Sequence, residues 1–273
     1  MKIYMSYWSG GYQKIPNQYV VDLHKLAAYY AKINYGDVTL ITDSNSKEFF
    51  KDAPFSTITT ELDVFNGVEC KNWALGKLYA YKLIAEKREP FLHIDYDVFL
   101  MKPIDKKYEE ESNILVQSLE TGSYKHYQLE KFYSSLTPYL KEKYGFESSD
   151  ETYKAFNMGI FGCFKDYDFV VNYGTKAVEF SLEEDTKKTY AEMFKYKSWA
   201  PATITEQHYL WLLTHKQNIS VTSYLNGDDK TRERKIQTDN DATDKGYVHI
   251  MGYKNMPQVK GKVYQKLKEF SLI

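Results

Sequence analysis

Two aspartates within an apolar segment are the side chains of this sequence best suited to chemistry. Asp95 and Asp97 stand one residue apart in the run from Phe91 to Leu100, which is short enough to be a buried strand. Ionised carboxylates near a core must be paired, hydrogen-bonded or bound to a cation. A divalent cation shared between these carboxylates and a substrate diphosphate would meet that need. The alternative is a pair that caps a strand end and binds backbone amides.

The same pattern occurs twice more and serves as a control. Asp166 and Asp168 flank a tyrosine in an identical tripeptide, and Asp239 and Asp241 repeat the spacing. The tripeptide at 166 precedes a helical-looking segment, so we expect a turn with Asp168 as the helix N-cap. The pair at 239 lies in a polar stretch and is expected in solvent. Only the D-x-D at 95 has apolar residues on both sides, so its context identifies the candidate site.

Composition indicates an ordinary globular protein. The chain has 273 residues, of which 43% are hydrophobic, and its formal net charge is -1, so we expect no nucleic-acid partner. Cys70 and Cys163 form neither a disulfide framework nor a metal-binding spacing. The sequence has no apolar leader and no apolar run approaching about 18 residues. These features predict a cytoplasmic protein.

The apolar pattern of the first hundred residues alternates between strand and helix. We expect strands at 2–8, 37–42, 56–62 and 91–100, with helices at 17–33 and 73–86. This order predicts an α/β fold with a doubly wound, mostly parallel sheet flanked by helices. Ligands of such sheets bind at the carboxyl ends of the strands, where the D-x-D falls.

The rest of the chain continues without a linker, which predicts a single domain over 1–273. We expect strands at 113–118, 156–164 and 219–225, a helical excursion at 122–154, and helices at 168–196 and 204–216. The polar tract 226–246 is either an active-site lid or a disordered insertion. The segment 259–273 either packs as a terminal helix or makes a peripheral membrane contact.

Four segments around the D-x-D form a recognisable series. They are Gly76-Lys77-Leu78 before it, and Phe156-Asn157-Met158-Gly159, Glu206-Gln207 and His249-Ile250-Met251-Gly252-Tyr253-Lys254 after it. In this order they resemble the GT-A glycosyltransferases of the glycogenin and LgtC galactosyltransferase type, the retaining family 8 class. The resemblance spans most of the chain. It implies a Rossmann-like GT-A domain with a nucleotide-binding half at 1–103 and an acceptor-side half at 104–273 that carries the C-terminal metal-ligand segment.

The resemblance implies metal-dependent transfer of a hexose from a UDP-sugar to a saccharide or other hydroxyl acceptor, with retention. Asp95, Asp97 and His249 would bind Mn²⁺ or Mg²⁺, and oxygen ligands with one imidazole suit Mn²⁺. The leaving phosphate oxygen would itself accept the proton of the acceptor.

The resemblance also assigns roles around the metal. Lys254 would contact the diphosphate, with Gly252 beside it. Near the donor sugar would lie Lys77 and Asn157, while Glu206 would bind the sugar hydroxyls and Gln207 would lie beneath the anomeric carbon. The uracil and ribose would be held by Tyr4, Ser6, Tyr7 and Asp43. Of these, Gln207, Glu206, Asn157 and Lys254 are the catalytic candidates. Each has a structural alternative: an exposed helix lysine for Lys77, a core hydrogen bond for Asn157, and a favourable helix-dipole position for Glu206.

Other functions fit less well. A glycoside hydrolase needs two carboxyls about 5 Å apart for retention or about 6.5 to 9.5 Å apart for inversion, whereas side chains two apart on a strand point the same way, as co-ligands. A phosphatase of the D-x-D-x-(T/V) kind would not have Phe99. The family's Lys-Pro-Trp is Lys254-Asn255-Met256 here, and Glu206 replaces an aspartate. These departures keep open a non-catalytic nucleotide-sugar or glycan-binding protein on the same fold.

Overall fold

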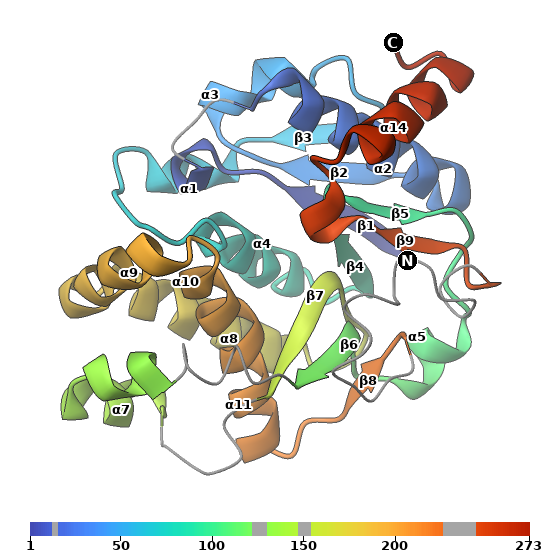
Figure 1. Ribbon diagram of the computed structural model, residues 1–273. Coiled ribbons are helices and arrows are strands. Elements are labelled where there is room, and N and C mark those ends of the chain that lie inside the picture. The colour runs from blue at the N-terminus through green and yellow to red at the C-terminus, as the bar shows by residue number, and fades with distance from the viewer. Residues whose placement is uncertain (13–15, 122–129, 147–153, 226–243) are drawn as a thin grey trace.

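The computed structural model describes residues 1–12, 16–121, 130–146, 154–225 and 244–273. Within these residues, seven strands form a central sheet in the order β3-β2-β1-β4-β7-β6-β8 (Figure 1). The strands are β1 (Lys2–Ser6), β2 (Val38–Ile41), β3 (Thr57–Thr59), β4 (Phe91–Ile94), β6 (Ile114–Thr121), β7 (Lys154–Cys163) and β8 (Val221–Ser223). Strands β3, β2, β1 and β4 run parallel, β7 is antiparallel to both neighbours, and β8 is parallel to β6.

Helices cover both faces of this sheet (Figure 1). On one face α2 (Gln18–Tyr35) packs with the C-terminal α14 (Pro257–Glu269), and on the other lie α4 (Leu75–Ala85), α8 (Tyr167–Leu182) and α11 (Tyr209–Lys216). Alternate residues of β1 enter the two cores, because successive strand side chains point to opposite faces. Ile3 and Met5 join one core and Tyr4 joins the other. The predicted α/β class with a mostly parallel, helix-flanked sheet is confirmed.

Local signals fix the crossover between the first two strands. The Asn17 side chain accepts a hydrogen bond from the backbone N–H of Val20 and caps the start of α2. Gly36, at φ 87°, ends the helix and donates its backbone N–H to the carbonyl of Lys32. The other helices of the described residues include α1 (Ser9–Tyr12), α3 (Ser44–Lys47), η1 (Glu48–Phe50), η2 (Glu61–Phe65), α5 (Lys107–Glu111), α7 (Pro138–Tyr144), α9 (Glu184–Tyr196), α10 (Ala200–Ala202) and η4 (Met251–Tyr253).

The predicted continuous strand at 91–100 is wrong in one respect. The chain leaves the main sheet at Ile94, and the D-x-D forms a turn in which the backbone N–H of Val98 donates to the carbonyl of Asp95 at 3.0 Å. Beyond it, β5 (Val98–Leu100) pairs with β9 (Tyr247–His249) in a separate two-stranded sheet. The turn takes the two carboxylates out of the pleated sheet, so they lie at its carboxyl end rather than within it.

Three other expectations can be compared with the structure. The excursion predicted at 122–154 falls between the end of β6 at Thr121 and the start of β7 at Lys154; α7 lies inside it, while 122–129 and 147–153 fall outside the described residues. The turn at the second D-x-D is confirmed, but Asp166 is the N-cap of α8, and Asp168 pairs with Arg88 in its first turn. The pair at 239 and 241 and most of the tract 226–246 also lie outside the described residues.

The C-terminal segment packs as a helix, since Val263 and Leu267 of α14 are buried. In the part of the chain that the structure describes, no helix is long and apolar enough to cross a membrane.

Candidate metal and substrate site

A cavity of about 560 Å³ opens at the carboxyl ends of β1 and β4. Most of the side chains predicted from sequence line it: Ser6, Tyr7, Lys77, Asp95, Asp97, Asn157, Gln207, His249, Gly252 and Lys254. They come from segments that are distant in the sequence, so the fold itself brings them together. Tyr4, Asp43 and Glu206 are not among the lining residues.

Two backbone interactions bring His249 to the D-x-D. In the small sheet Val98 is the register partner of His249, and the backbone N–H of Ile250 donates to the carbonyl of Asp97 at 3.1 Å. One ligand atom from each of Asp95, Asp97 and His249 lies within 4.8 Å of the others. His249 Nε2 is 3.4 Å from Asp97 Oδ1. Two carboxylates and an imidazole so arranged could hold a divalent cation.

Lys254 neutralises the second oxygen of Asp97. Its Nζ donates to Asp97 Oδ2 at 2.9 Å and to the hydroxyl of Tyr96 at 2.8 Å. Its backbone carbonyl accepts a hydrogen bond from the Tyr19 hydroxyl. Burial alone would raise the pKa of Asp97, but the ammonium of Lys254 and the contact with His249 outweigh it and hold that pKa well below its usual range. Asp97 is therefore a carboxylate ready for a cation, with an ammonium group already on it.

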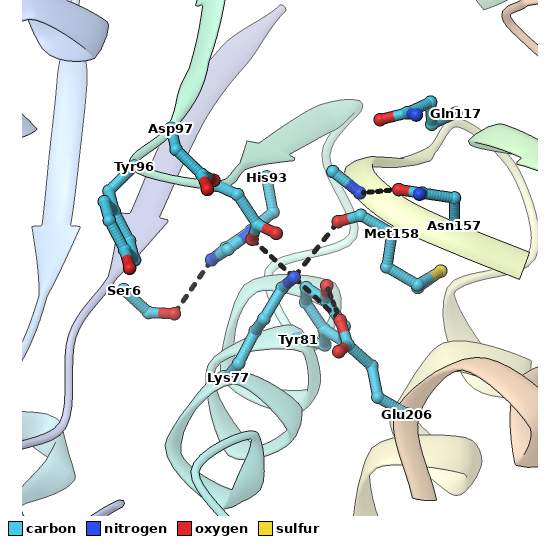
Figure 2. Close-up of polar contacts among 12 residues, drawn as sticks. Ser6, Lys77, Tyr81, His93, Tyr96, Asp97, Gln117, Asn157, Met158 and Glu206 are labelled. Atoms are coloured by element: carbon cyan, nitrogen blue, oxygen red, sulfur yellow. Dashed lines mark hydrogen bonds and ion pairs between the residues drawn. The ribbon is translucent and has the colours of Figure 1, made fainter. Parts of the chain in front are cut away.

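A second lysine lies between two carboxylates (Figure 2). Lys77 Nζ is 2.5 Å from Asp95 Oδ1 and 2.7 Å from Glu206 Oε1, and it also donates to the carbonyl of Met158. The hydroxyl of Tyr81 donates to the same Glu206 oxygen at 3.0 Å. Burial raises the pKa of both Asp95 and Glu206, although Lys77 opposes the shift in each. The three charged groups form one buried network with an excess negative charge.

Glu206 belongs to the protein interior rather than to the cavity. The residue has no exposed surface, and its Oε2 has no hydrogen-bond partner among the described residues. It lies in η3 (Thr203–His208), a π-helical segment that continues into α11. Such wide turns are often found at functional sites. Here the turn directs Glu206 inward to Lys77, while the next residue, Gln207, lines the cavity.

Two residues predicted to hold the nucleotide do not line the cavity and make contacts within the fold. The Tyr4 ring packs edge-on against Phe91, with 6.2 Å between ring centroids. The Asp43 carboxylate accepts from the backbone N–H of Ser46 at 2.9 Å, as the N-cap of α3, and from that of Ser9 at 2.6 Å. Ser6 and Tyr7, which follow along β1, reach the cavity.

Asn157 forms part of the cavity wall on β7. Its amide nitrogen donates to Glu120 Oε1 at 2.7 Å, and its amide oxygen accepts from the backbone N–H of Gly159 at 3.0 Å. The carbonyl of Gly159 in turn accepts from the backbone N–H of Asp95 at 3.0 Å. Asn157 is thus hydrogen-bonded within the protein and also lines the cavity, while its place beside a donor sugar stays a prediction.

Sequence reasoning missed the tryptophans of the cavity. Trp8, Trp73 and Trp199 line it, which accounts for three of the four in the chain. The 16% aromatic content was the available signal. It could not locate these rings, because an indole on an apolar helix face has the same pattern as a core residue.

The chain belongs to the family described as "Family of unknown function (DUF6734)", which matches residues 1–270. Among curated proteins, none matches this sequence.

Several solved structures follow a similar chain path. Mouse xyloside xylosyltransferase 1, in its apo form, has a TM-score of 0.48 and 10% identity, over 94% of this chain and 99% of its own. The galactosyltransferase LgtC, in complex with donor and acceptor sugar analogues, has a TM-score of 0.45 and 12% identity, over 92% of this chain and 87% of its own. An active-site mutant of LgtC has a TM-score of 0.48 and 12% identity, over 98% of this chain and 95% of its own.

Proposed function

We propose that this member of the DUF6734 family is a metal-dependent glycosyltransferase that moves a hexose from a UDP-sugar to a saccharide or other hydroxyl acceptor, with retention. The observation that carries the proposal is the group of Asp95, Asp97 and His249 beside Lys254 on the wall of one cavity. It combines a set of metal ligands with a cation suited to phosphate.

The donor atoms fit a hard or borderline divalent cation. Two carboxylates and one imidazole suit Mn²⁺, with Mg²⁺ as the alternative. Three protein ligands leave coordination positions for diphosphate oxygens and water. When bound, the cation would supply the positive charge that stabilises a leaving diphosphate.

The charge of the site favours joint binding of cation and nucleotide. Asp95, Asp97 and Glu206 against Lys77 and Lys254 leave one net negative charge, counting the imidazole as neutral. A divalent cation reverses that charge and so creates an electrostatic attraction for a diphosphate. We therefore expect Mn²⁺ and UDP to bind together and each to bind weakly alone.

Lys254 is the residue we expect to change partners. Its side chain is 29% exposed, whereas its partner Asp97 is 5% exposed. When a cation binds Asp97, the Lys254 ammonium becomes available to a diphosphate oxygen, where it would stabilise the leaving group. Gly252, two residues before Lys254, also lines the cavity.

The other cavity residues divide between donor sugar and nucleotide. Gln207 and Asn157 line the cavity, where Gln207 would offer an amide beneath the anomeric carbon and Asn157 one beside the sugar. Ser6 and Tyr7 would contact the uracil and ribose. Lys77, with Glu206, holds Asp95 in place and, from the cavity wall, would lie near the donor sugar.

In the proposed reaction the bond between the anomeric carbon and the diphosphate oxygen breaks, and a bond to the acceptor oxygen forms on the same face. The acceptor's proton passes to the leaving diphosphate oxygen. An α-UDP donor should thus give an α-linked product, and NMR of the anomeric proton in fresh product tests this; a β product would overturn retention.

Calorimetric titration of UDP, with and without Mn²⁺, tests the metal. Asp97→Asn should lose the Mn²⁺-dependent gain in UDP affinity. Asp168→Asn is the matched control, because Asp168 occupies the same Asp-Tyr-Asp tripeptide on the surface, where its side chain is 79% exposed. UDP affinity that is unaffected by EDTA, or equal losses in both variants, would remove the metal from the mechanism.

Turnover of a UDP-sugar panel with Mn²⁺ separates the enzyme from the non-catalytic alternative. Release of UDP from one donor supports glycosyl transfer, whereas tight binding of UDP and Mn²⁺ without turnover would favour a nucleotide-sugar or glycan-binding protein. Gln207→Ala should reduce turnover far more than UDP affinity, since its contact is used mainly in the transition state.

A further inference from the structure

His249 is held from behind by a buried side chain outside the cavity lining. Gln117, on β6, is fully buried, and its Oε1 is 2.7 Å from His249 Nδ1. The hydroxyl of Tyr247 donates to the same amide oxygen. Tyr247 and His249 lie two residues apart on β9 and therefore share a face of that strand. Both side chains converge on one acceptor.

An irregularity in the main sheet accommodates Gln117. The pairing of β6 with β7 shifts register around this residue: Val116 pairs with Phe161, but Ser118 pairs with Asn157. Three residues of β7 therefore oppose Gln117 alone. Such bulges re-aim side chains and are frequent beside active sites.

Gly159 provides the space for the contact within the widened stretch of β7. A Cβ built on Gly159 would lie 2.6 Å from His249 Nδ1 and would also collide with the Gln117 amide oxygen. Any side chain here would separate the pair. The backbone of β7, the bulge and the glycine thus serve the same contact.

The contact determines which nitrogen of His249 is free. The Gln117 amide oxygen, which faces both the Tyr247 hydroxyl and Nδ1, only accepts hydrogen bonds, so with the amide in this orientation Nδ1 carries the hydrogen and donates it. In a neutral imidazole Nε2 is then an unprotonated lone pair. That nitrogen faces Asp97 Oδ1 at 3.4 Å, where two acceptors oppose each other until a cation lies between them.

We propose that Gln117 is a positioning residue that fixes His249 in the Nδ1–H tautomer and directs Nε2 to the cation bound by Asp95 and Asp97. The role rests on the proposed metal site. Partners of this kind orient metal-bound histidines, and their loss lowers metal affinity about 10- to 100-fold.

Matched variants isolate the acceptor. Gln117→Met keeps the length of the side chain and removes its oxygen, whereas Gln117→Glu keeps an oxygen that can accept from Nδ1. Tyr247→Phe is the control, because it removes the other donor to the same oxygen and leaves the His249 contact. Mn²⁺ affinity is measured by electron paramagnetic resonance titration without nucleotide. The His249 tautomer is read from ring ¹⁵N shifts of metal-free protein, with His249→Asn to assign the signal.

We expect the hydrogen of wild-type His249 on Nδ1, a loss of about 10- to 100-fold in Mn²⁺ affinity in Gln117→Met, and most of the affinity retained in Gln117→Glu and Tyr247→Phe. A hydrogen on Nε2 in the wild type overturns the role, and this result needs no variant to fold. A folded Gln117→Met with wild-type Mn²⁺ affinity also overturns the role of Gln117. In that case loss of Mn²⁺ binding in Asp97→Asn would still support the metal site. Wild-type protein that binds no Mn²⁺ overturns the metal site itself and, with it, this role.

Discussion

Replacing Lys77 with methionine tests whether its ammonium is the structural counter-ion of the buried network. The variant keeps most of the side-chain volume but leaves Asp95 and Glu206 together without the cation that lies 2.5 Å and 2.7 Å from them. Breaking a buried ion pair from one side costs about 3 to 5 kcal/mol. We expect the free energy of unfolding at pH 7 to fall by about that amount, a large share of the roughly 5 to 15 kcal/mol of a typical domain.

The pH dependence of this loss has a definite sign. Burial already raises the pKa of Asp95 and Glu206, and removal of Lys77 should raise both further. Acids with a higher pKa in the folded state bind more protons there than in the unfolded state, so stability is gained as the pH falls. The deficit of Lys77→Met should therefore shrink between pH 7 and pH 5. Adding Glu206→Gln, which removes one of the two charges, should recover part of it at pH 7.

Urea denaturation followed by tryptophan fluorescence and circular dichroism measures these differences. Lys82→Met is the matched control, because Lys82 lies on the same helix, α4, in a surface pair with Glu86. Surface pairs of this kind contribute about 0 to 1 kcal/mol. If Lys77→Met were as stable as Lys82→Met, the counter-ion argument would be refuted, and contact with the substrate would be the better account of Lys77.

Three further variants or conditions test neighbouring features. Gly159→Ala should weaken Mn²⁺ binding and cost about 1 to 3 kcal/mol of stability, because its Cβ would press on the ligand histidine. Gly261→Ala, whose Cβ meets no atom within 4 Å inside helix α14, should leave Mn²⁺ affinity unchanged and raise stability by about 0.5 to 1 kcal/mol, and equal Mn²⁺ affinity of the two variants would contradict the argument. Burial lowers the pKa of His24 and His208 to about 4, so as the pH falls these histidines take up protons in the unfolded state before they do so in the folded state. Each histidine should therefore reduce the free energy of unfolding by up to about 3 kcal/mol between pH 6.5 and pH 4. Urea midpoints that do not fall between pH 7 and pH 5 would count against this prediction. Lys254→Met should bind Mn²⁺ more tightly in the absence of nucleotide, because the Lys254 ammonium competes with the cation for Asp97. In the presence of Mn²⁺ the variant should bind UDP more weakly, because the ammonium then contacts the diphosphate. Calorimetry measures both affinities, and the opposite pattern would refute the proposed change of partner by Lys254.

Much of the fold follows from local patterns that the sequence displays. The apolar periodicities at 17–33 and 73–86 became α2 and α4, and the apolar runs after Lys2 and at Asp37 became β1 and β2. These elements need only their own side chains and caps to be recognised. The D-x-D was found for a similar reason, because carboxylates in an apolar run are conspicuous wherever they occur.

Other features depend on contacts between distant segments. That Val98 pairs with His249 is a matter of β-register across 151 residues, which no local signal encodes. Whether Glu206 or Gln207 faces the cavity depends on the π-helical geometry of η3, which the dipeptide sequence does not reveal. The position of Gln117 depends on the register shift between β6 and β7, and β7 begins at Lys154, far along the chain. The family resemblance could place the dipeptide in the site, but only the packing of η3 decides which side chain reaches the cavity.

The buried network also implies that Asp95 carries a cost that only a cation offsets. Lys77 and Glu206 balance each other at 2.7 Å, so the charge of Asp95 is in excess, and burial raises its pKa. Asp95→Asn preserves the shape and an acceptor for Lys77 while removing that charge. The metal-free variant should therefore be at least as stable as the wild type at pH 7, as active sites often sacrifice stability for function. Mn²⁺ should raise the unfolding temperature of the wild type by mass action and leave that of Asp95→Asn unchanged. Thermal unfolding with and without Mn²⁺ measures both effects, and a metal-free variant that is clearly less stable than the wild type would show that Asp95 is structural and that its charge is not held for a cation.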